Sequence, residues 1–168
     1  LMSKASSLYR CLSKTIFSAS TLIKVLNDEI CETTTRGMFV TMIVGVYDKN
    51  KNELLLSNAG HEPPLIFSKE GNFKTIDEAG PPLGIAPNFK FTEQTISFKE
   101  SSMYIFTDGI TEMKNNNGEM LGQEGFQDYI KKYQSTPNNK RLQKMIEDLI
   151  GSGRIQKDDL TIVTVDGK

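Results

Sequence analysis

The sequence predicts an α+β fold in which helices pack against antiparallel sheets. Apolar residues recur at helical spacing near the start of the chain, at Leu8, Leu12 and Ile16, and again in its last third. Between these stretches lie short β-branched and apolar runs, separated by turn segments at 48–52 and 69–72. Strands joined by such short turns form hairpins, and hairpins build antiparallel sheets.

The elements follow one another as two helices, a series of strands, two helices and a closing strand. A serine, Ser18 or Ser20, is placed to cap the second helix. The helical spacing predicts helices over about residues 3–16, 21–31, 122–133 and 138–150. The β-type runs predict hairpins of 39–47 with 53–60 and of 65–67 with 73–76, a rigid loop at 80–84, and strands at 91–98, 102–107 and 160–165.

Length and composition indicate a single globular domain over residues 1–168. The net charge is −1, from 20 Lys and Arg against 21 Asp and Glu, which disfavours binding to nucleic acid or to a charged membrane surface. No apolar run has the length of a membrane span. The two cysteines, Cys11 and Cys31, are too few for a disulfide framework. We expect both to be small core residues on apolar helix faces, and we expect a cytoplasmic location.

Acidic residues stand at the ends of two apolar runs in the second half of the chain. Asp108 follows the run 103–107, and Asp158 and Asp159 precede the run 160–163. Because a strand fixes a direction, carboxylates at such tips can converge through the fold, where they repel one another unless they share a cation. Oxygen ligands of this kind suit Mg²⁺ and Mn²⁺. Taken singly, Asp108 before Gly109 also suits a turn, and Asp158 with Asp159 also suits a solvated charge pair.

Five motifs follow one another along the chain, at residues 37–41, 57–64, 80–84, 107–112 and 158–161. Together they resemble the metal-dependent PP2C-type serine/threonine phosphatases, in particular the bacterial SpoIIE/RsbU-like branch. The resemblance implies an αββα layered sandwich and a two-metal Mn²⁺ or Mg²⁺ site, at which a metal-bridged water attacks phosphoserine or phosphothreonine directly.

The resemblance also implies roles for single residues. Asp108 and Asp158 match the family's metal ligands, and Asp159 matches the adjacent position, which is often Asn or Asp. No catalytic residue is implied beyond the metal ligands. His61 is the only histidine, and its glycine and proline neighbours favour a loop-packing role over general-base catalysis.

The sequence departs from this family at its start. The family has a Gly-Asp-x-x-Gly-x-Gly segment that holds the metals, and it should lie just upstream of residues 1–4. Since the chain also begins with Leu1, we expect a piece of a longer protein that lacks the first strands of the sandwich and is inactive alone. The apolar strands 39–47 and 54–56 would then be uncovered, which predicts self-association, for example as a homodimer.

Two functions stay open on the sequence. The first is a phosphatase of bacterial partner-switching and stress signalling, acting on a phosphorylated protein of the anti-sigma-antagonist type, with a sensor domain upstream. The second is an inactive pseudophosphatase that binds a phosphoprotein, which the absent metal segment favours. A receiver-type phosphoacceptor domain would have its acidic pair early and a parallel sheet, so we discount it. Substrate-binding residues and the choice between Mn²⁺ and Mg²⁺ stay open.

Overall fold

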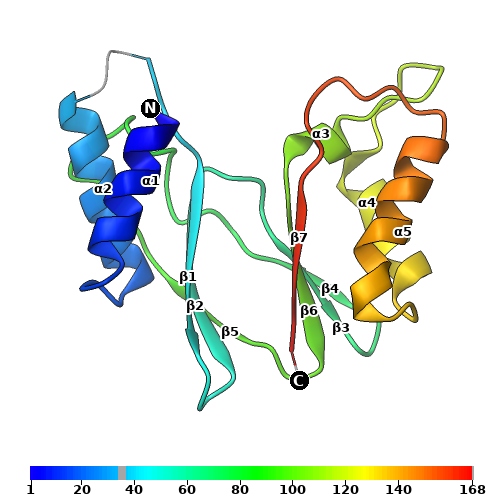
Figure 1. The fold of residues 1–168 in the computed structure, drawn as a ribbon, viewed down its shortest axis with the longest axis horizontal. Coiled ribbons are helices and arrows are strands. Elements are labelled where there is room, and N and C mark those ends of the chain that lie inside the picture. The colour runs from blue at the N-terminus through cyan, green and yellow to red at the C-terminus, as the bar shows by residue number, and fades with distance from the viewer. Residues whose placement is uncertain (34–36, 168) are drawn as a thin grey trace. The chain divides into compact units, whose positions relative to one another are not determined.

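The computed structural model describes residues 1–33 and 37–167. Its elements follow the predicted order, with one short helix, α3, that the sequence did not predict (Figure 1). The helices are α1 (Met2–Leu12), α2 (Ala19–Thr33), α3 (Asp108–Thr111), α4 (Gly122–Tyr133) and α5 (Asn138–Gly151). The strands are β1 (Met42–Asp48), β2 (Glu53–Ala59), β3 (Leu65–Ser68), β4 (Phe73–Thr75), β5 (Gln94–Ser97), β6 (Ser101–Phe106) and β7 (Ile162–Asp166).

The chain forms two compact units. The first consists of Leu1–Pro63 and Ile76–Lys99, and the second of Pro64–Thr75 and Glu100–Lys168. The backbone therefore passes from one unit to the other three times, and neither unit is a continuous stretch of sequence. Each unit combines helices with one antiparallel sheet, which confirms the predicted α+β class. That the two units act as a single domain stays a prediction.

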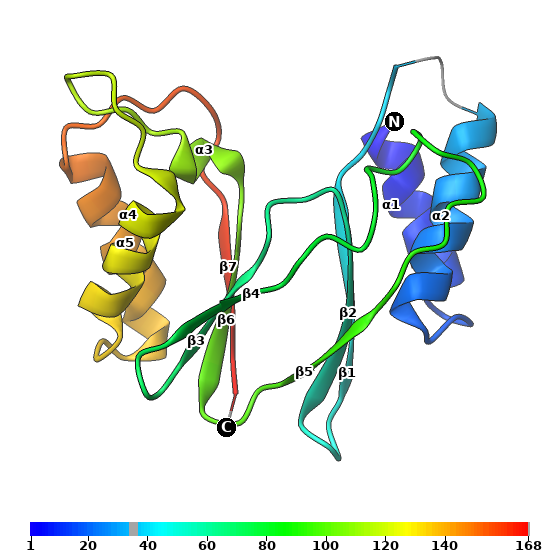
Figure 2. The same cartoon turned by 180° about the vertical axis from the view of Figure 1, so that it is seen from behind.

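The first unit is built on the predicted hairpin of β1 and β2. The two strands pair in register from Met42 with Ala59 to Asp48 with Glu53, and β5 joins the other edge of β2. Helices α1 and α2 lie on one side of this sheet (Figure 2). The apolar stripe of α2 supplies much of the core, so helical spacing and burial agree. The core residues of this unit are Ala5, Ala19, Leu22, Ile23, Leu26, Ile30, Val40, Val44, Ala59, Leu83 and Phe91.

Polar contacts fix the start of α2. The Ser18 hydroxyl accepts a hydrogen bond from the Thr21 amide at 3.2 Å, which confirms Ser18 as the capping residue. The Glu93 carboxylate accepts hydrogen bonds from the Ser20 amide at 3.0 Å and from the Ser18 hydroxyl at 3.1 Å. Donation by the Ser20 amide, and by the hydroxyls of Ser20 and Ser18, holds the pKa of Glu93 below its usual value, against the opposing effect of burial. A negative charge at a helix N-terminus also interacts favourably with the helix dipole.

A buried amide ties α2 to the predicted rigid loop. Asn27 is fully buried, and its Nδ2 donates to the Ala86 carbonyl at 2.9 Å while its Oδ1 accepts from the Gly84 amide at 3.1 Å. Leu83, within the loop, forms an isolated antiparallel bridge with Val40. The loop is therefore fixed both by the Asn27 side chain and by backbone pairing with Val40. The strand predicted at 39–47 begins only at Met42.

The second unit is a four-stranded sheet in the order β4-β3-β6-β7, with α4 and α5 packed against it (Figure 1). All of its strand pairs are antiparallel, including the predicted hairpin of β3 and β4. Aromatic packing joins the sheet to the helices, since the rings of Phe106 on β6 and Phe126 on α4 lie 4.7 Å apart. The core of this unit consists of Leu65, Phe67, Tyr104, Phe106, Ile110, Met113, Leu121, Phe126, Ile130, Met145 and Leu149.

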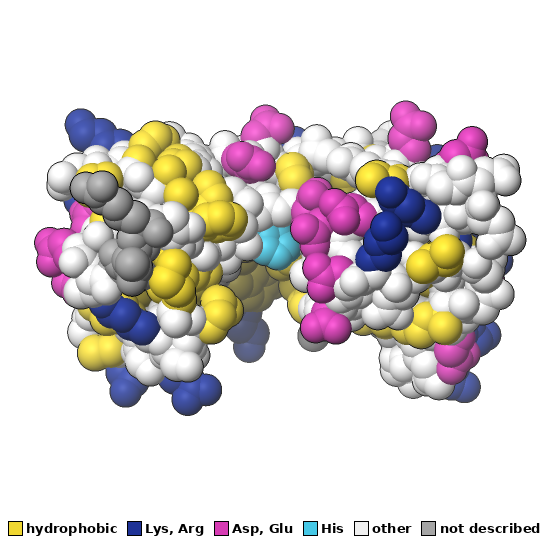
Figure 3. All heavy atoms as spheres, turned by 90° about the horizontal axis from the view of Figure 1, so that it is seen from above, with side chains coloured by type: hydrophobic (Ala, Val, Ile, Leu, Met, Phe, Trp, Pro, Cys, Tyr) yellow, Lys and Arg dark blue, Asp and Glu magenta, His cyan; other side chains and the backbone are white. Residues whose placement is uncertain are grey.

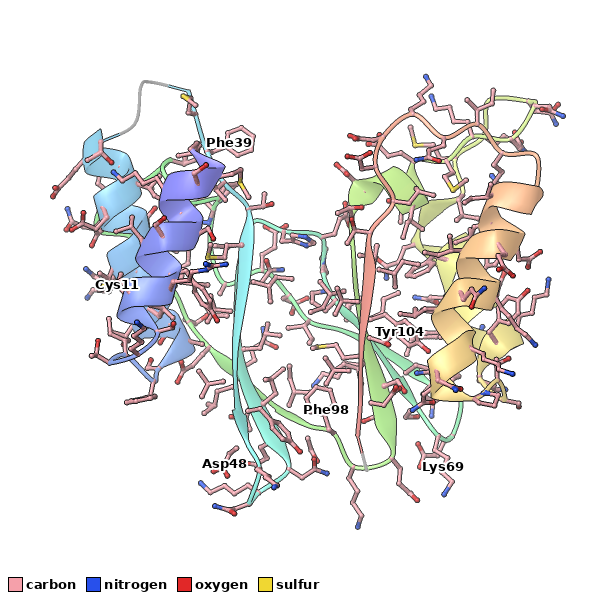
Figure 4. All side chains as sticks on the ribbon, in the orientation of Figure 1. Cys11, Phe39, Asp48, Lys69, Phe98 and Tyr104 are labelled. Atoms are coloured by element: carbon pink, nitrogen blue, oxygen red, sulfur yellow. The ribbon has the colours of Figure 1, made fainter. Side chains whose placement is uncertain are left out.

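A buried ion pair joins α5 to the end of β7. The Arg141 side chain is 6% exposed, and it pairs with the Asp166 carboxylate, which also accepts a hydrogen bond from the Ser102 hydroxyl at 2.5 Å. The Arg141 guanidinium lies 5.6 Å from the centre of the Tyr104 ring, which is directed from the sheet towards α5 (Figure 4). Because the charges of Arg141 and Asp166 are mostly shielded from water, each needs the other.

The surface of α1 differs from the expectation at one cysteine. Cys11 is exposed on the outer side of α1 and Cys31 is half-buried, so the prediction that both are core residues is wrong for Cys11 (Figure 4). Cys11 lies at the edge of the short apolar stripe of α1, which buries only Ala5 completely. The self-association predicted for strands 39–47 and 54–56 stays a prediction. Within the described residues, no helix is long and apolar enough to cross a membrane.

Replacing Arg141 with alanine is expected to destabilise the protein by about 3 kcal/mol, because it leaves the Asp166 carboxylate partly buried without its partner. The matched control is Lys69→Ala. Lys69 pairs with Glu100 at 2.7 Å, but both side chains are more than half exposed, so a loss of less than about 1 kcal/mol is expected. Urea unfolding followed by circular dichroism measures both. Equal losses in the two variants would contradict the role given to burial.

Stability is also expected to depend on pH through Glu93. Since its pKa is lower in the folded than in the unfolded protein, its ionised form stabilises the fold fully above the usual glutamate pKa. This contribution is lost as the pH falls below that value and through the lowered pKa of the folded protein. Glu93→Gln keeps a hydrogen-bond acceptor but removes the charge. The variant should be less stable than wild type at about pH 7, and the difference should shrink near about pH 4. Glu78→Gln, at an exposed carboxylate of the same unit, is the control.

Candidate metal centre at the end of β6 and β7

Asp108 stands where β6 turns into a helix. The strand ends at Phe106, Thr107 keeps an extended backbone, and Asp108 is the first residue of α3. The Asp108 carbonyl accepts hydrogen bonds from the Glu112 amide at 2.8 Å and from the Thr111 hydroxyl at 3.1 Å. These bonds fix the backbone at Asp108 while its side chain stays exposed.

Asp158 and Asp159 lie in the loop that leads into β7. The Asp158 side chain accepts a hydrogen bond from the Asp159 amide at 2.7 Å, and the Asp158 carbonyl accepts one from the Gln156 side chain at 2.9 Å. Both aspartates are exposed. The loop is thus held by its own polar contacts shortly before the strand begins at Ile162.

The fold brings these two acidic segments together. The last pair of the β6–β7 ladder is Phe106 with Ile162, so the residues after β6 and before β7 meet at the same end of the sheet. Thr107 continues the contact, because its amide donates to the Thr161 carbonyl at 3.2 Å and its hydroxyl donates to the Asp159 carbonyl at 3.0 Å. Segments 50 residues apart in sequence therefore lie side by side.

Gly109 makes room for this approach. A Cβ atom at Gly109 would overlap the Asp159 carbonyl oxygen and would come within 3.4 Å of the Asp158 carbonyl carbon. Gly109 lies inside α3 with a negative φ, so a turn is not the reason for glycine after Asp108. Sequence reasoning missed this steric role, and it missed the hydroxyl of Thr107. The only signal for either was its position next to Asp108, directly after an apolar run.

The electrostatics of this end suit a cation. On the second unit, acidic side chains gather at the end where α3 and the loop before β7 lie (Figure 3). Within the described ranges, Asp108, Asp158 and Asp159 take part in no salt bridge, so their charges are not balanced by a lysine or arginine. Exposed carboxylate oxygens without a cationic partner are the donors that Mg²⁺ and Mn²⁺ prefer.

The acidic side chains at this end do not form a ready group of three ligands within the described residues. Among residues 1–33 and 37–167, no three His, Cys, Asp or Glu side chains are grouped in positions that could hold a metal ion. The chemistry of Asp108, Asp158 and Asp159 fits a divalent cation, and the segments that carry them are in contact, but the described chain does not complete a coordination sphere. Their role as metal ligands stays a prediction.

His61 belongs to the first unit, in the loop after β2. The Asn58 side chain contacts its backbone twice, by accepting from the His61 amide and donating to the His61 carbonyl, both at 2.9 Å. The imidazole Nδ1 lies 3.1 Å from the Glu62 carbonyl. These contacts are those of a residue that shapes its own loop, in keeping with the role expected from the sequence.

Comparison with known sequences identifies relatives along the whole chain. The family model for stage II sporulation protein E (SpoIIE) matches residues 1–168. Protein IcfG of Synechocystis sp. is 31% identical over 156 residues, which cover 90% of this chain and 24% of IcfG. Phosphoserine phosphatase RsbU of Bacillus subtilis is 26% identical over 157 residues, which cover 92% of this chain and 47% of RsbU.

Solved structures share the fold. The RsbU and RsbW domains of Rv1364c from Mycobacterium tuberculosis match with a TM-score of 0.80 and 20% identity, over 97% of this chain and 46% of that one. The phosphatase domain of SpoIIE from Bacillus subtilis, presoaked with manganese, matches with a TM-score of 0.63 and 18% identity, over 95% of this chain and 70% of that one. These matches confirm the predicted PP2C-type fold.

The chain spans about a quarter of the length of IcfG and about half of the length of RsbU. Within that span, the match to the family model runs from the first residue to the last. This chain therefore belongs to the SpoIIE family, with the fold of a PP2C-type phosphatase domain.

Proposed function

We propose that this chain forms the phosphatase domain of a metal-dependent protein serine/threonine phosphatase. The observation that carries the proposal is the contact between the segments of Asp108 and of Asp158 and Asp159, at one end of an antiparallel strand pair. The family to which the chain belongs, and its relative RsbU, a phosphoserine phosphatase, support the same function.

Asp108 and Asp158 would hold Mn²⁺ or Mg²⁺, with Asp159 beside them. A divalent cation bound there would neutralise phosphoryl oxygens and make water a stronger nucleophile at neutral pH. The protein itself fixes the backbones of the acidic residues, through the Asp108 carbonyl in α3 and the Gln156 contact to Asp158. It also keeps the carboxylates free of lysine and arginine partners within the described ranges. The three carboxylates are therefore exposed to solvent and accessible to a cation.

The proposed substrate is a phosphoserine or phosphothreonine residue of a regulatory protein of the anti-sigma-antagonist type. Two relatives support a partner-switching role in bacterial signalling, namely RsbU and the Mycobacterium tuberculosis protein that carries RsbU and RsbW domains. The exposure of the acidic end suits a protein substrate, because a phosphorylated side chain can approach it from solvent. A sensor domain elsewhere in the full-length protein would regulate the reaction.

A pseudophosphatase that binds a phosphoprotein without turnover is the second candidate. The observation that favours it is the lack of a ready group of three ligands within the described residues. Metal-dependent hydrolysis of a phosphoserine peptide by the full-length protein separates the two functions. Turnover with Mn²⁺ that is abolished by a chelator supports the enzyme. Phosphopeptide binding without turnover supports the second candidate.

In the full-length protein, Asp108→Asn and Asp158→Asn are each expected to lower kcat with Mn²⁺ by at least about 100-fold, because ligands of one cation act as a unit. Both variants should stay folded, since the side chains are exposed. Asp128→Asn, on the exposed side of α4 in the same unit, is the matched control and should keep wild-type activity. Hydrolysis of a phosphoserine peptide measures all of them.

The same assay tests the neighbouring assignments. Asp159→Asn is expected to be milder than Asp158→Asn, and equal losses would mean that the terminal motif is displaced by one residue. His61→Ala is expected to leave most of the activity, because its contacts lie within its own loop. A loss as large as that of Asp108→Asn would contradict the proposed roles.

The isolated chain, residues 1–168, is expected to show little Mn²⁺-dependent hydrolysis of p-nitrophenyl phosphate, because its described acids do not complete a metal site. The full-length protein assayed in parallel is the reference. Strong turnover by the isolated chain, abolished by Asp108→Asn, would show that these residues suffice.

A further inference from the structure

The hydroxyl of Thr107 does not make the hydrogen bond that is usual at its position in the chain. Thr107 is the N-cap residue of α3, where a threonine side chain normally accepts a hydrogen bond from an amide of the first helical turn. Here the side chain makes no capping bond. It is used instead across the gap between β6 and the loop before β7, where its oxygen accepts from the Thr161 amide at 3.1 Å and its proton goes to the Asp159 carbonyl at 3.0 Å.

The geometry of the backbone explains this use. In a continuing antiparallel ladder, the Thr161 amide would donate to the Thr107 carbonyl. That carbonyl instead accepts from the Ile110 amide at 3.1 Å, because the chain turns into α3. The Thr107 hydroxyl replaces it as the acceptor. The ladder thus extends one step beyond its last regular pair, Phe106 with Ile162.

The Thr107 hydroxyl serves both partners from a single atom. The Thr161 amide needs an acceptor and the Asp159 carbonyl needs a donor, and a serine or threonine oxygen supplies both from one atom. An isosteric valine supplies neither. The two partners lie on either side of Leu160, in the segment that follows Asp158. The hydroxyl oxygen of Thr107, the residue before Asp108, therefore holds the loop that carries Asp158 and Asp159.

We propose that Thr107 is a positioning residue for the metal centre, which sets the placement of Asp158 and Asp159 relative to Asp108 through its hydroxyl. The inference rests on the proposed function, because it assigns these aspartates to a shared cation. Thr107 itself contacts neither metal nor substrate in this role. Groups that orient metal ligands in this way typically affect metal affinity by about 10- to 100-fold.

The test compares Thr107→Val, Thr107→Ser and the control Thr164→Val in the full-length protein. Thr164 lies in β7 three residues beyond Thr161, so its variant removes a hydroxyl from the same strand pair without touching the acidic end. Titration with Mn²⁺ alone, followed calorimetrically, gives the affinity. Hydrogen exchange of the Thr161 amide, measured without metal, reports on the two hydrogen bonds of the Thr107 hydroxyl themselves.

Thr107→Val is expected to weaken Mn²⁺ binding by about tenfold or more and to speed exchange at the Thr161 amide. Thr107→Ser and Thr164→Val should match wild type in both measurements. If Thr107→Val does not fold, Thr107→Ala, which removes the hydroxyl without the branched bulk, takes its place. Wild-type Mn²⁺ affinity in the hydroxyl-free variant would overturn the role of Thr107.

The outcomes distinguish a failure of the role given to Thr107 from a failure of the proposed phosphatase function. Wild-type protein that binds Mn²⁺, together with an unaffected Thr107→Val variant, overturns the inference and leaves the phosphatase standing. Wild-type protein that binds no Mn²⁺ overturns both. Faster exchange at Thr161 in the Thr107→Val variant with unchanged Mn²⁺ affinity also overturns the inference. The hydrogen bonds of the Thr107 hydroxyl would then stabilise the loop without affecting the metal.

Discussion

The pairing of β6 with β7 is the constraint on which the candidate site depends. In an antiparallel pair, the residue after one strand lies beside the residue before its partner. Asp108 comes just after β6, and Asp158 and Asp159 come just before β7, so the ladder alone brings them to one end of the sheet. A register slip of one residue would turn every side chain of β7 to the other face and would move the acidic loop away.

The register is held at both ends. At one end, Asp166 of β7 pairs with Arg141 and accepts from Ser102, the residue opposite it on β6. At the other end, the Thr107 hydroxyl and the space at Gly109 hold the loop before β7. A buried ion pair is an expensive feature whose best-attested use is to specify one arrangement over others. Arg141 and Asp166 fix the end of the β6–β7 ladder that lies opposite the acidic residues.

Most elements of the fold and the acidic positions of the candidate site could be predicted, because they depend on residues close together in sequence. Neighbouring residues determine hairpin turns, helical stripes and the acids at strand ends. The capping of α2 by Ser18 is an example. The contacts of Thr107 and Gly109 could not be predicted, because their partners are some 50 residues away and are backbone atoms with no side-chain signal. Cys11 was placed wrongly because a short amphipathic helix such as α1 buries only a narrow stripe, and periodicity does not fix its edge.

The passage of the chain back and forth between the two units has a consequence for synthesis on the ribosome. The first unit receives β5 only after β3 and β4 of the second unit have been made, and β7, which the acidic end requires, is the last of the described strands to be made. Chains emerge from the N-terminus and fold as their elements become complete. A nascent chain that ends between residues 108 and 158 therefore has Asp108 without Asp158, and the strand pairing that joins their segments needs β7.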